Sequence, residues 1–251
     1  MPVLFQDFNS KHCSLCGEIS KLTGEHKIKR SALKNEFGET PLYIGQGNKS
    51  TRFKIVQSTK SKHFKFETSI CESCNTRKTQ PADLEFDSFN KTARMILNSG
   101  GDPATVFDLP QYREGTEAYL NVFRYFAKLL CCHLSEVKAP LLLRLSKFAI
   151  HSTNENCVFL AIQKDWFHEK INEFLGETQS ASHGGLTVYG NKSSKTAERF
   201  QSTLSIGPLQ YIFYINLSAE ERSELNALHP RFSKFCHRSI TLAIQNQKLT
   251  D

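Results

Sequence analysis

The chain has 251 residues, of which 39% are hydrophobic, and this content is ordinary for a folded protein with a core. Its longest apolar runs are much shorter than the about 20 residues of a membrane helix, and its first residues lack the pattern of a signal peptide. These features predict a cytoplasmic protein of one large or two modest domains, with no membrane contact.

The positive charge lies in the first third of the chain. The formal net charge is +7, and residues 1–80 contain 14 Lys and Arg against 7 Asp and Glu, whereas residues 81–251 contain 18 against 18. A concentrated basic field is typical of a surface that contacts phosphates, but a merely solvated basic face gives the same count. Charge alone leaves both interpretations open.

The first part of the chain combines short alternating runs with many turn formers, which predict strands and loops between residues 10 and 80. The turn formers at 45–48 separate two of these runs and predict a hairpin inserted within about residues 36–68. Helical spacing of apolar residues follows Pro81 and ends at Gly100 and Gly101. The expected elements are strands at 42–44, 53–56 and 63–70 and a helix at 82–98.

Turn-forming residues at 99–113 predict a linker between an N-terminal domain, 1–98, and a C-terminal domain, 114–251. The second domain mixes helical and strand patterns, so the predicted fold class is α+β throughout. A polar stretch at 180–194 predicts a mobile loop. The expected elements are helices at 119–130, 140–149, 166–175 and 219–228 and strands at 157–162, 186–189, 200–205 and 209–217.

Four of the eight cysteines form two C-x-x-C pairs, Cys13 with Cys16 and Cys71 with Cys74. In a reducing compartment such pairs are typical zinc ligands, because each short spacing directs two thiolates at one ion. The 54 residues between the pairs must fold to bring them together. The other four are expected in the core: Cys131, Cys132, Cys157 and Cys236.

The sequence around these pairs resembles the HNH nuclease family. The first pair is followed by Glu25-His26, and the second by Asn75 and Lys78, which gives the order C-x-x-C, acidic-His, C-x-x-C-N-x-x-K over about residues 11–87. This resemblance implies a ββα-metal fold, in which a hairpin and a helix hold one catalytic divalent ion while a separate four-cysteine zinc site stabilises the module. It also implies an endonuclease that hydrolyses phosphodiester bonds.

Phosphodiester hydrolysis requires a base, a cation and groups that position the phosphate. His26 is the candidate general base, because a neutral imidazole accepts a proton from water near pH 7. Glu25 and Asn75 offer hard oxygen ligands for Mg²⁺ or Mn²⁺. An isolated Glu-His dipeptide is more often a solvated surface feature, and the flanking cysteines are what favour the catalytic interpretation.

Basic side chains beside these positions are candidates for phosphate contact, with solvated surface as the alternative for each. They are Lys27, Lys29, Arg30, Arg77 and Lys78. The expected partner is nucleic acid, with double-stranded DNA as the first expectation, and the sequence does not distinguish DNA from RNA. A resemblance to prokaryotic family members suggests a role in restriction or phage defence.

Two departures from the family pattern affect the details. The middle asparagine of the pattern has no clear counterpart, with Asn35 and Asn48 as candidates, and the insertion at about 36–68 is long for this module. His63 is a candidate further metal ligand, but its neighbours Lys62 and Lys65 favour a strand residue that contacts phosphate or solvent.

The second domain has no recognisable catalytic signature, and we leave the polar segment 182–185 unassigned. By analogy with other fused domains, it is expected to recognise the target, sense an activating ligand or form a homo-oligomer. Two alternatives to the enzyme remain: a zinc-containing module that binds nucleic acid without cleaving it, and a purely structural or protein-interaction module. We rank the nuclease first, because binding alone does not require the combination of Glu25, His26 and Asn75.

Overall fold

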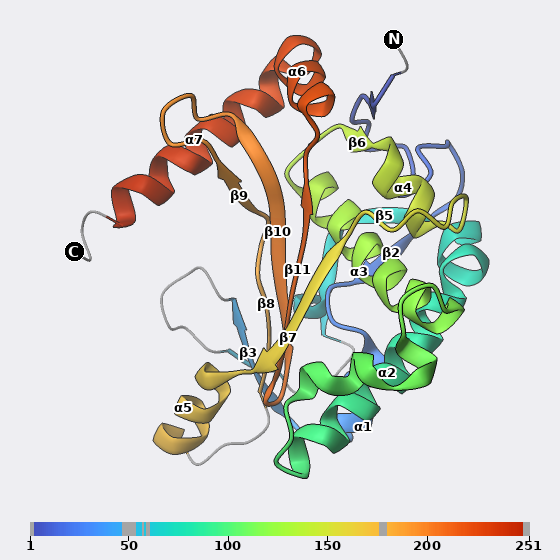
Figure 1. Ribbon diagram of the computed structural model, residues 1–251, viewed down its shortest axis with the longest axis vertical. Coiled ribbons are helices and arrows are strands. Elements are labelled where there is room, and N and C mark those ends of the chain that lie inside the picture. Colours follow the sequence, from blue (N-terminus) through green and yellow to red (C-terminus); the bar gives the residue numbers. More distant parts are fainter. Residues whose placement is uncertain (1–2, 47–53, 57, 59–60, 176–179, 248–251) are drawn as a thin grey trace.

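A seven-stranded sheet runs through the middle of the molecule in the computed structural model (Figure 1). The structure describes residues 3–46, 54–56, 58, 61–175 and 180–247. The strand order is β4-β3-β8-β10-β11-β7, and β9 also pairs with β10; β3 and β8 run parallel, and the other described pairs are antiparallel. The strands are β3 (Leu42–Gln46), β4 (Lys54–Val56), β7 (Phe159–Lys164), β8 (Ser180–His183), β9 (Thr187–Gly190), β10 (Ala197–Ile206) and β11 (Leu209–Asn216).

The long hairpin of β10 and β11 organises this sheet. Ile206 pairs with Leu209, so that two residues form the turn, and Gly207 there has a φ of 56°, which side chains with a Cβ rarely adopt. Apolar residues alternate along both strands, and Phe200 and Phe213 on one face are fully buried. Alternation with period two therefore gives the sheet one buried and one open face.

Helices α2, α3 and α4 lie on one side of the sheet, and α5 lies on the other side in the view of Figure 1. Helix α7 packs against β9 and β10, and its Phe232 ring lies 5.7 Å from that of the buried Phe200. The central helix α3 is almost entirely buried and packs against α2 and α4. None of the helices in the described ranges is long and apolar enough to cross a membrane. The helices are α1 (Arg30–Phe37), α2 (Gln80–Asn98), α3 (Glu117–Glu136), α4 (Leu143–Ala149), α5 (Trp166–Leu175), α6 (Ala219–Leu228) and α7 (Pro230–Gln247).

Two small sheets complete the fold. Strand β2 (Leu22–His26) pairs antiparallel with β5 (Lys65–Cys71), and α3 packs against β5. Strand β1 (Phe5–Gln6) pairs with β6 (Leu141–Leu142), which joins the start of the chain to its middle. Short helices connect these elements: η1 (Lys62–Phe64), η2 (Cys74–Lys78), η3 (Pro103–Asp108) and η4 (Pro110–Tyr112).

The mixed α+β class and most of the expected elements are confirmed. The helix expected at 82–98 is α2, the helix at 119–130 is the centre of α3, and the expected strands at 63–70, 157–162, 186–189, 200–205 and 209–217 correspond to β5, β7, β9, β10 and β11. The inserted hairpin is β3 with β4, and Gly47, Asn48 and Phe53 lie outside the described residues.

Three local expectations were wrong. Residues 30–37 form the helix α1 rather than strand or loop, because two turns are too short to show a helical period. Residues 180–183 form the central strand β8 rather than a mobile loop, since Ser180 and His183 are buried between β3 and β10. The helix expected at 140–149 begins only at Leu143, because Leu141 and Leu142 pair with β1.

Elements on both sides of the expected linker share one sheet and one hydrophobic core. Strand β3 comes from the first 98 residues yet pairs with β8, and buried residues from both parts form one contiguous cluster. The linker itself contains η3, which packs against α2. The first 98 residues and the remainder are therefore interwoven, and the division into two domains at 99–113 stays a prediction.

Candidate metal centre and the strand beside it

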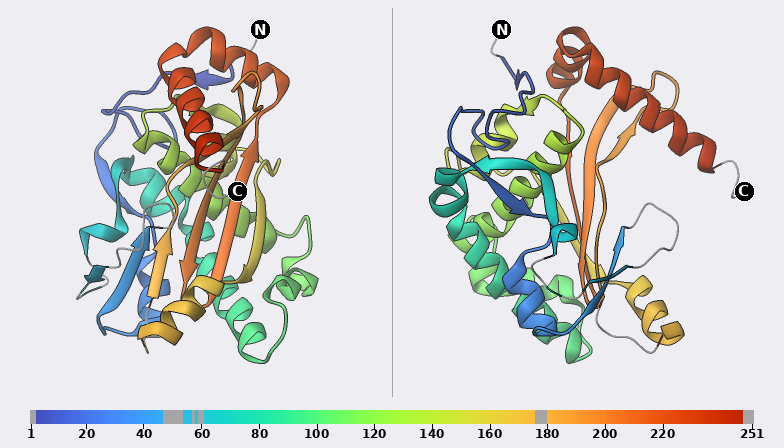
Figure 2. Two further views of the ribbon diagram at one scale, coloured as in Figure 1. Left: turned by 90° about the vertical axis from the view of Figure 1, so that its left-hand side faces the viewer. Right: turned by 180° about the vertical axis from the view of Figure 1, so that it is seen from behind.

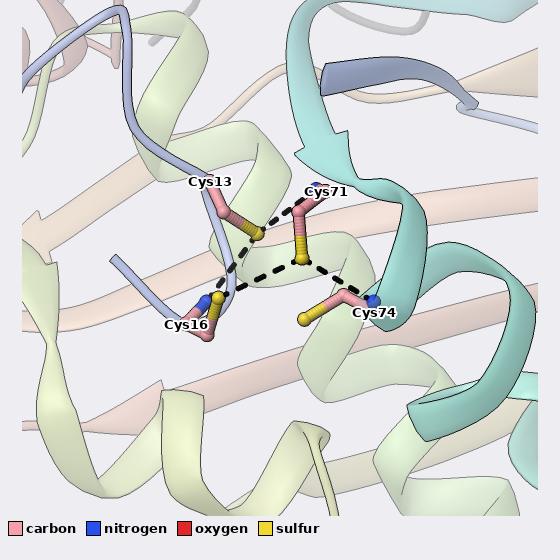
Figure 3. A group of neighbouring side chains, drawn as sticks. All are labelled: Cys13, Cys16, Cys71 and Cys74. Atoms are coloured by element: carbon pink, nitrogen blue, oxygen red, sulfur yellow. Dashed lines mark hydrogen bonds between the residues drawn. The ribbon is translucent and has the colours of Figure 1, made fainter. Parts of the chain in front are cut away.

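The four paired cysteines come together in one cluster, as Figure 3 shows. The sulfurs of Cys13, Cys16, Cys71 and Cys74 all lie within 4.8 Å of one another, and Cys16 Sγ is 3.8 Å from Cys71 Sγ. A tetrahedral zinc with Zn–S bonds of about 2.3 Å requires sulfurs about 3.8 Å apart. Four cysteines in this arrangement can hold a metal ion such as zinc.

Local backbone geometry builds each half of the cluster. The amides of Leu15 and Cys16 donate to Cys13 Sγ at 3.4 and 3.5 Å, and the amide of Cys74 donates to Cys71 Sγ at 3.3 Å. Gly17 closes the first turn with a φ of 72°, which favours glycine. Short spacing therefore folds both knuckles in the way that the sequence predicts.

The pairing of β2 with β5 joins the two knuckles. Leu22 pairs with Cys71, and the Cys71 amide donates to Cys13 Sγ at 3.1 Å across the junction. Contacts from the C-terminal part support the same place, because Ser146 Oγ donates to the Leu15 carbonyl and Ser135 Oγ accepts from Ser14 Oγ at 2.9 Å. The cluster thus depends on residues far beyond the expected N-terminal domain.

The thiols of the cluster differ in acidity. A hydrogen bond with the Cys74 side chain, followed by the amide donors, lowers the pKa of Cys13 to about 4 against the effect of burial. Burial is the main reason that the pKa of Cys16 rises to about 11. Zinc binds deprotonated thiolates, so binding of a divalent ion to the cluster would release the protons that the thiols carry.

His26 is the last residue of β2 and is partly exposed. Burial, and then the positive charges of Lys65, Lys128 and Arg30, lower the pKa of His26 below its ordinary value, while Glu25 opposes them. The neutral imidazole that results at pH 7 is the form that accepts a proton. This environment is compatible with a general base.

Glu25 lies in a buried ion-pair network that the sequence reasoning missed. Lys128 Nζ on α3 donates to Glu25 Oε1 at 3.1 Å and to Asp83 Oδ1 on α2 at 2.5 Å. Burial by itself would lower the pKa of Lys128, but the two carboxylates together raise it above its ordinary value. The Glu25 Oε2 oxygen forms no hydrogen bond with a residue that the structure describes.

A signal for this network exists in the sequence. Lys128 interrupts the apolar run of α3 between Ala127 and Leu129, both of which are fully buried. A lysine at such a position requires a buried carboxylate partner, because an unpaired buried ammonium is costly. The partners themselves come from β2 and α2 and could not be identified from spacing.

Asn75 follows the last cysteine and faces β2. Its Nδ2 donates to Thr23 Oγ1 at 2.9 Å, which leaves the amide oxygen for another ligand. Thr23 and Glu25 lie on the same strand, and the pairing of β2 with β5 is irregular between Gly24 and His26, the last residue of the strand. Asn75 thus contacts β2 at Thr23, on the strand that carries Glu25 and ends at His26.

The expected phosphate-binding residues divide into two groups. Lys27 pairs with Glu136 at 2.9 Å and Lys29 with Asp87 at 2.6 Å, and all four side chains are less than a quarter exposed. Arg30 and Arg77 are exposed, and Lys78 is partly buried. The arginines are therefore available to a polyanion, whereas the two lysines are already neutralised.

The remaining candidates lie apart from this group. Asn35 is exposed on α1, and Asn48 lies outside the described residues, so neither is identified as the middle asparagine of the HNH pattern. His63 is exposed in η1, where its amide donates to Ser61 Oγ at 3.3 Å. Among the described residues, the possible metal-binding group consists of the four cysteines and does not include His63.

Comparisons with protein-family models, with curated proteins and with solved structures gave no match for this chain. The geometry described above is therefore the basis for a functional conclusion.

Proposed function

We propose that this protein is a divalent-metal-dependent nuclease of the HNH type, with His26 as the general base. The observation that carries the proposal is the junction of β2 and β5 at the four-cysteine cluster. It combines a strand-terminal histidine whose pKa is lowered with an asparagine that directly follows the last cysteine. A purely structural metal site requires neither residue.

In this proposal the four cysteines hold zinc as a structural ion. Their sulfur spacing fits tetrahedral coordination, and the cluster lies at the point where β2, β5 and the N-terminal turn meet. A structural ion at this point would fix the start of β2, and with it the position of His26.

The chain's own residues then supply base and phosphate contacts. Neutral His26 takes a proton from the attacking water, and exposed Arg30 and Arg77 contact the phosphates of double-stranded DNA. Mg²⁺ or Mn²⁺, when bound, would stabilise the negative charge that develops on the phosphate. Glu25 Oε2 and Asn75 Oδ1 are the oxygens assigned to hold that ion.

A second candidate function is supported by one observation. Lys128 already balances the charge of Glu25, and Lys27 and Lys29 are paired with carboxylates. This arrangement also suits a zinc-containing module that binds nucleic acid without cleaving it. We rank the nuclease first because binding without cleavage does not require a neutral histidine that can accept a proton at the strand end.

Incubation of the full-length protein with supercoiled plasmid tests the proposal. We expect nicking with Mg²⁺ or Mn²⁺ and none when the divalent ion is omitted. Glu25→Gln and Asn75→Ala should weaken metal binding, so that excess Mn²⁺ restores part of their activity, and His63→Ala should behave as the unaltered protein. Plasmid that stays intact at every ion concentration, but is retained in a gel shift, would support the binding module instead.

A further inference from the structure

Four side chains form a stacked row across the open face of the large sheet. This aromatic row consists of Tyr189 on β9, Arg199 on β10, Tyr214 on β11 and Phe159 on β7. Arg199 Cζ lies 4.1 Å from the centroid of the Tyr214 ring and 6.0 Å from that of Tyr189. The rings of Tyr214 and Phe159 stack with centroids 4.9 Å apart and an interplanar angle of 9°.

The strand register places the row on one face. Arg199 pairs with Tyr189, and Tyr214 pairs with both Gln201 and Phe159, and directly opposed residues of a sheet share a face. In the left view of Figure 2 this side of the sheet faces the viewer, with α7 above it and α5 below. The opposite face of the same strands is the buried core, so the row is not needed to fill it.

The row is open to solvent. Phe159 is 49% exposed and Tyr189 is 46% exposed. Single exposed aromatic residues are common on protein surfaces, but a stacked series across four strands is not explained by chance exposure. Large rings that are held open in this way are typical of surfaces that stack with a planar ligand.

The charge of this face suits a polyanion. The positions that pair across β9, β10, β11 and β7 on this side include amides, hydroxyls and Arg199 but no Asp or Glu. Glu198 sits in the bulge beside the row, 3.8 Å from Arg222 on α6. Arg199 Nε donates to Asn216 Oδ1 at 3.0 Å, and its two terminal nitrogens form no hydrogen bond or ion pair with a described residue, so they can donate to a phosphate.

A cavity of about 720 Å³ adjoins the Phe159 end of the row. Phe159, Tyr214, Tyr119 and Asn154 are among the residues that line it. Asn154, which lines the cavity, accepts from Arg124 Nη2 at 2.5 Å through its Oδ1. Aromatic walls with a few polar groups are what a flat heterocyclic base requires.

We propose that the aromatic row is a platform for single-stranded nucleic acid, whose bases stack on Phe159 and Tyr189 and whose phosphate is held by Arg199. This site lies on a different sheet from β2 and His26. The inference goes beyond the nuclease proposal and does not depend on it. It gives the C-terminal region the specific task of binding unpaired nucleotides.

Fluorescence anisotropy with the full-length protein tests this platform. The probes are one mixed-sequence 12-nucleotide strand as DNA, the same strand as RNA, and the DNA duplex, all in buffer without added divalent ions so that cleavage cannot consume them. We expect at least one of the two single strands, DNA or RNA, to bind more tightly than the duplex. The DNA and RNA arms decide which sugar the platform accepts.

Substitutions within the row should then weaken binding selectively. Phe159→Leu and Tyr189→Leu should each reduce single-strand affinity about 5- to 150-fold, the range that loss of one stacked base gives. Tyr189→Phe keeps the ring and should retain affinity. Trp166→Leu removes an aromatic residue, 57% exposed, that lies outside the row and should also leave binding unchanged.

Contrary results are equally clear. Single-strand affinity that is equal in Phe159→Leu, Tyr189→Leu and the unaltered protein would overturn the platform, as would a lack of any single-strand binding. His26→Ala should bind the probes normally. A protein that binds single strands through the row but never cuts DNA would remove the nuclease proposal alone, and the reverse result would remove the platform alone.

Photocrosslinking to the unaltered protein tests the same site without any substitution that could disturb the fold. A strand with 4-thiothymidine or 4-thiouridine should crosslink to Phe159, Tyr189 or the strands that carry them when the digested unaltered protein is examined by mass spectrometry. Crosslinks found only near Arg30 and Arg77 would contradict the platform.

Discussion

The paired strands β2 and β5 and the seven-stranded sheet are built in different ways. The pair is short, and it lies beside two C-x-x-C knuckles whose four sulfurs can hold a metal ion and beside buried ion pairs. The sheet buries alternating aromatic and branched residues on one face and uses no described metal-ligating cluster. One region therefore depends on a few specific polar contacts, and the other on many apolar contacts that are individually weak.

This difference determines how each region responds to change. Loss of one cysteine or one buried charge beside the paired strands β2 and β5 leaves its partners uncompensated, so the effect of a single substitution is large. On the sheet, the energetic effect of a single substitution is spread over the contacts with many neighbouring residues. The two regions are nevertheless joined, because Lys128 of α3, which packs on the sheet, also pairs with Glu25 of β2.

The largest effect is expected for loss of a cysteine ligand. Cys71→Ser should eliminate bound zinc and destabilise β2 and β5, since structural zinc contributes on the order of 10 kcal/mol of binding free energy to small modules. Metal analysis should find one zinc per unaltered chain and none in the variant, with a marked fall in melting temperature. Cys236→Ala, a buried cysteine of α7 outside the cluster, should keep its zinc. Equal zinc content in Cys71→Ser would contradict the assignment.

The next effect concerns the charge that joins the two regions. Lys128→Met leaves Glu25 and Asp83 without their shared partner and should lower the free energy of unfolding by about 3–5 kcal/mol. Denaturant titration measures this change. Lys21→Met, which removes an exposed pair with Glu72, should cost about 0–1 kcal/mol.

A second variant separates charge from packing at this site. Adding Glu25→Gln and Asp83→Asn to Lys128→Met should recover part of the lost stability, because no unpaired charge then remains. If the triple variant is no more stable than Lys128→Met alone, the ion pairs are not what joins the regions.

The smallest of these effects is a pH dependence of the sheet. Burial, and then the charge of Lys27, lower the pKa of His183 to about 4, while the Gly184 carbonyl opposes them. The unfolded chain therefore binds a proton that the folded chain excludes, and stability falls as the pH decreases from about 6.5 toward 4. The contribution is at most about 1.4 kcal/mol per pH unit.

His183→Gln should reduce this slope, measured by denaturant titration at several pH values. Buried His133, whose pKa burial also lowers, should keep part of the acid dependence in the variant. An unchanged slope in His183→Gln would show that His183 has the same pKa in the folded and the unfolded chain, which would contradict this account.

The sequence predicted the cysteine cluster because the geometry of a C-x-x-C knuckle is local. It also predicted β10 and β11, since their alternation is regular and their turn is short. It could not predict that β3 pairs with β8 or that β1 pairs with β6, because such partners lie more than a hundred residues apart and any exposed edge could accept them. The interwoven fold follows from those distant pairings.

The candidate site shows the same limit. His26 and Asn75 were identified from their order relative to the cysteines, but the burial of Glu25 against Lys128 depends on how α3 packs. The aromatic row was equally hidden, because Tyr189, Arg199, Tyr214 and Phe159 become neighbours only when four strands are in register. Spacing predicts local chemistry, and tertiary packing decides which charges and rings meet.

The most direct test of the account is the single-turnover rate of plasmid nicking by His26→Ala at saturating Mn²⁺. Because His26 is asked only to accept a proton, the variant should keep its fold, its zinc and its affinity for DNA, and should be slower by about 10²- to 10⁴-fold. Excess metal should not restore the rate. Nicking by a clean His26→Ala preparation at the rate of the unaltered protein would contradict the central claim that this histidine is the base of a phosphodiester-cleaving site.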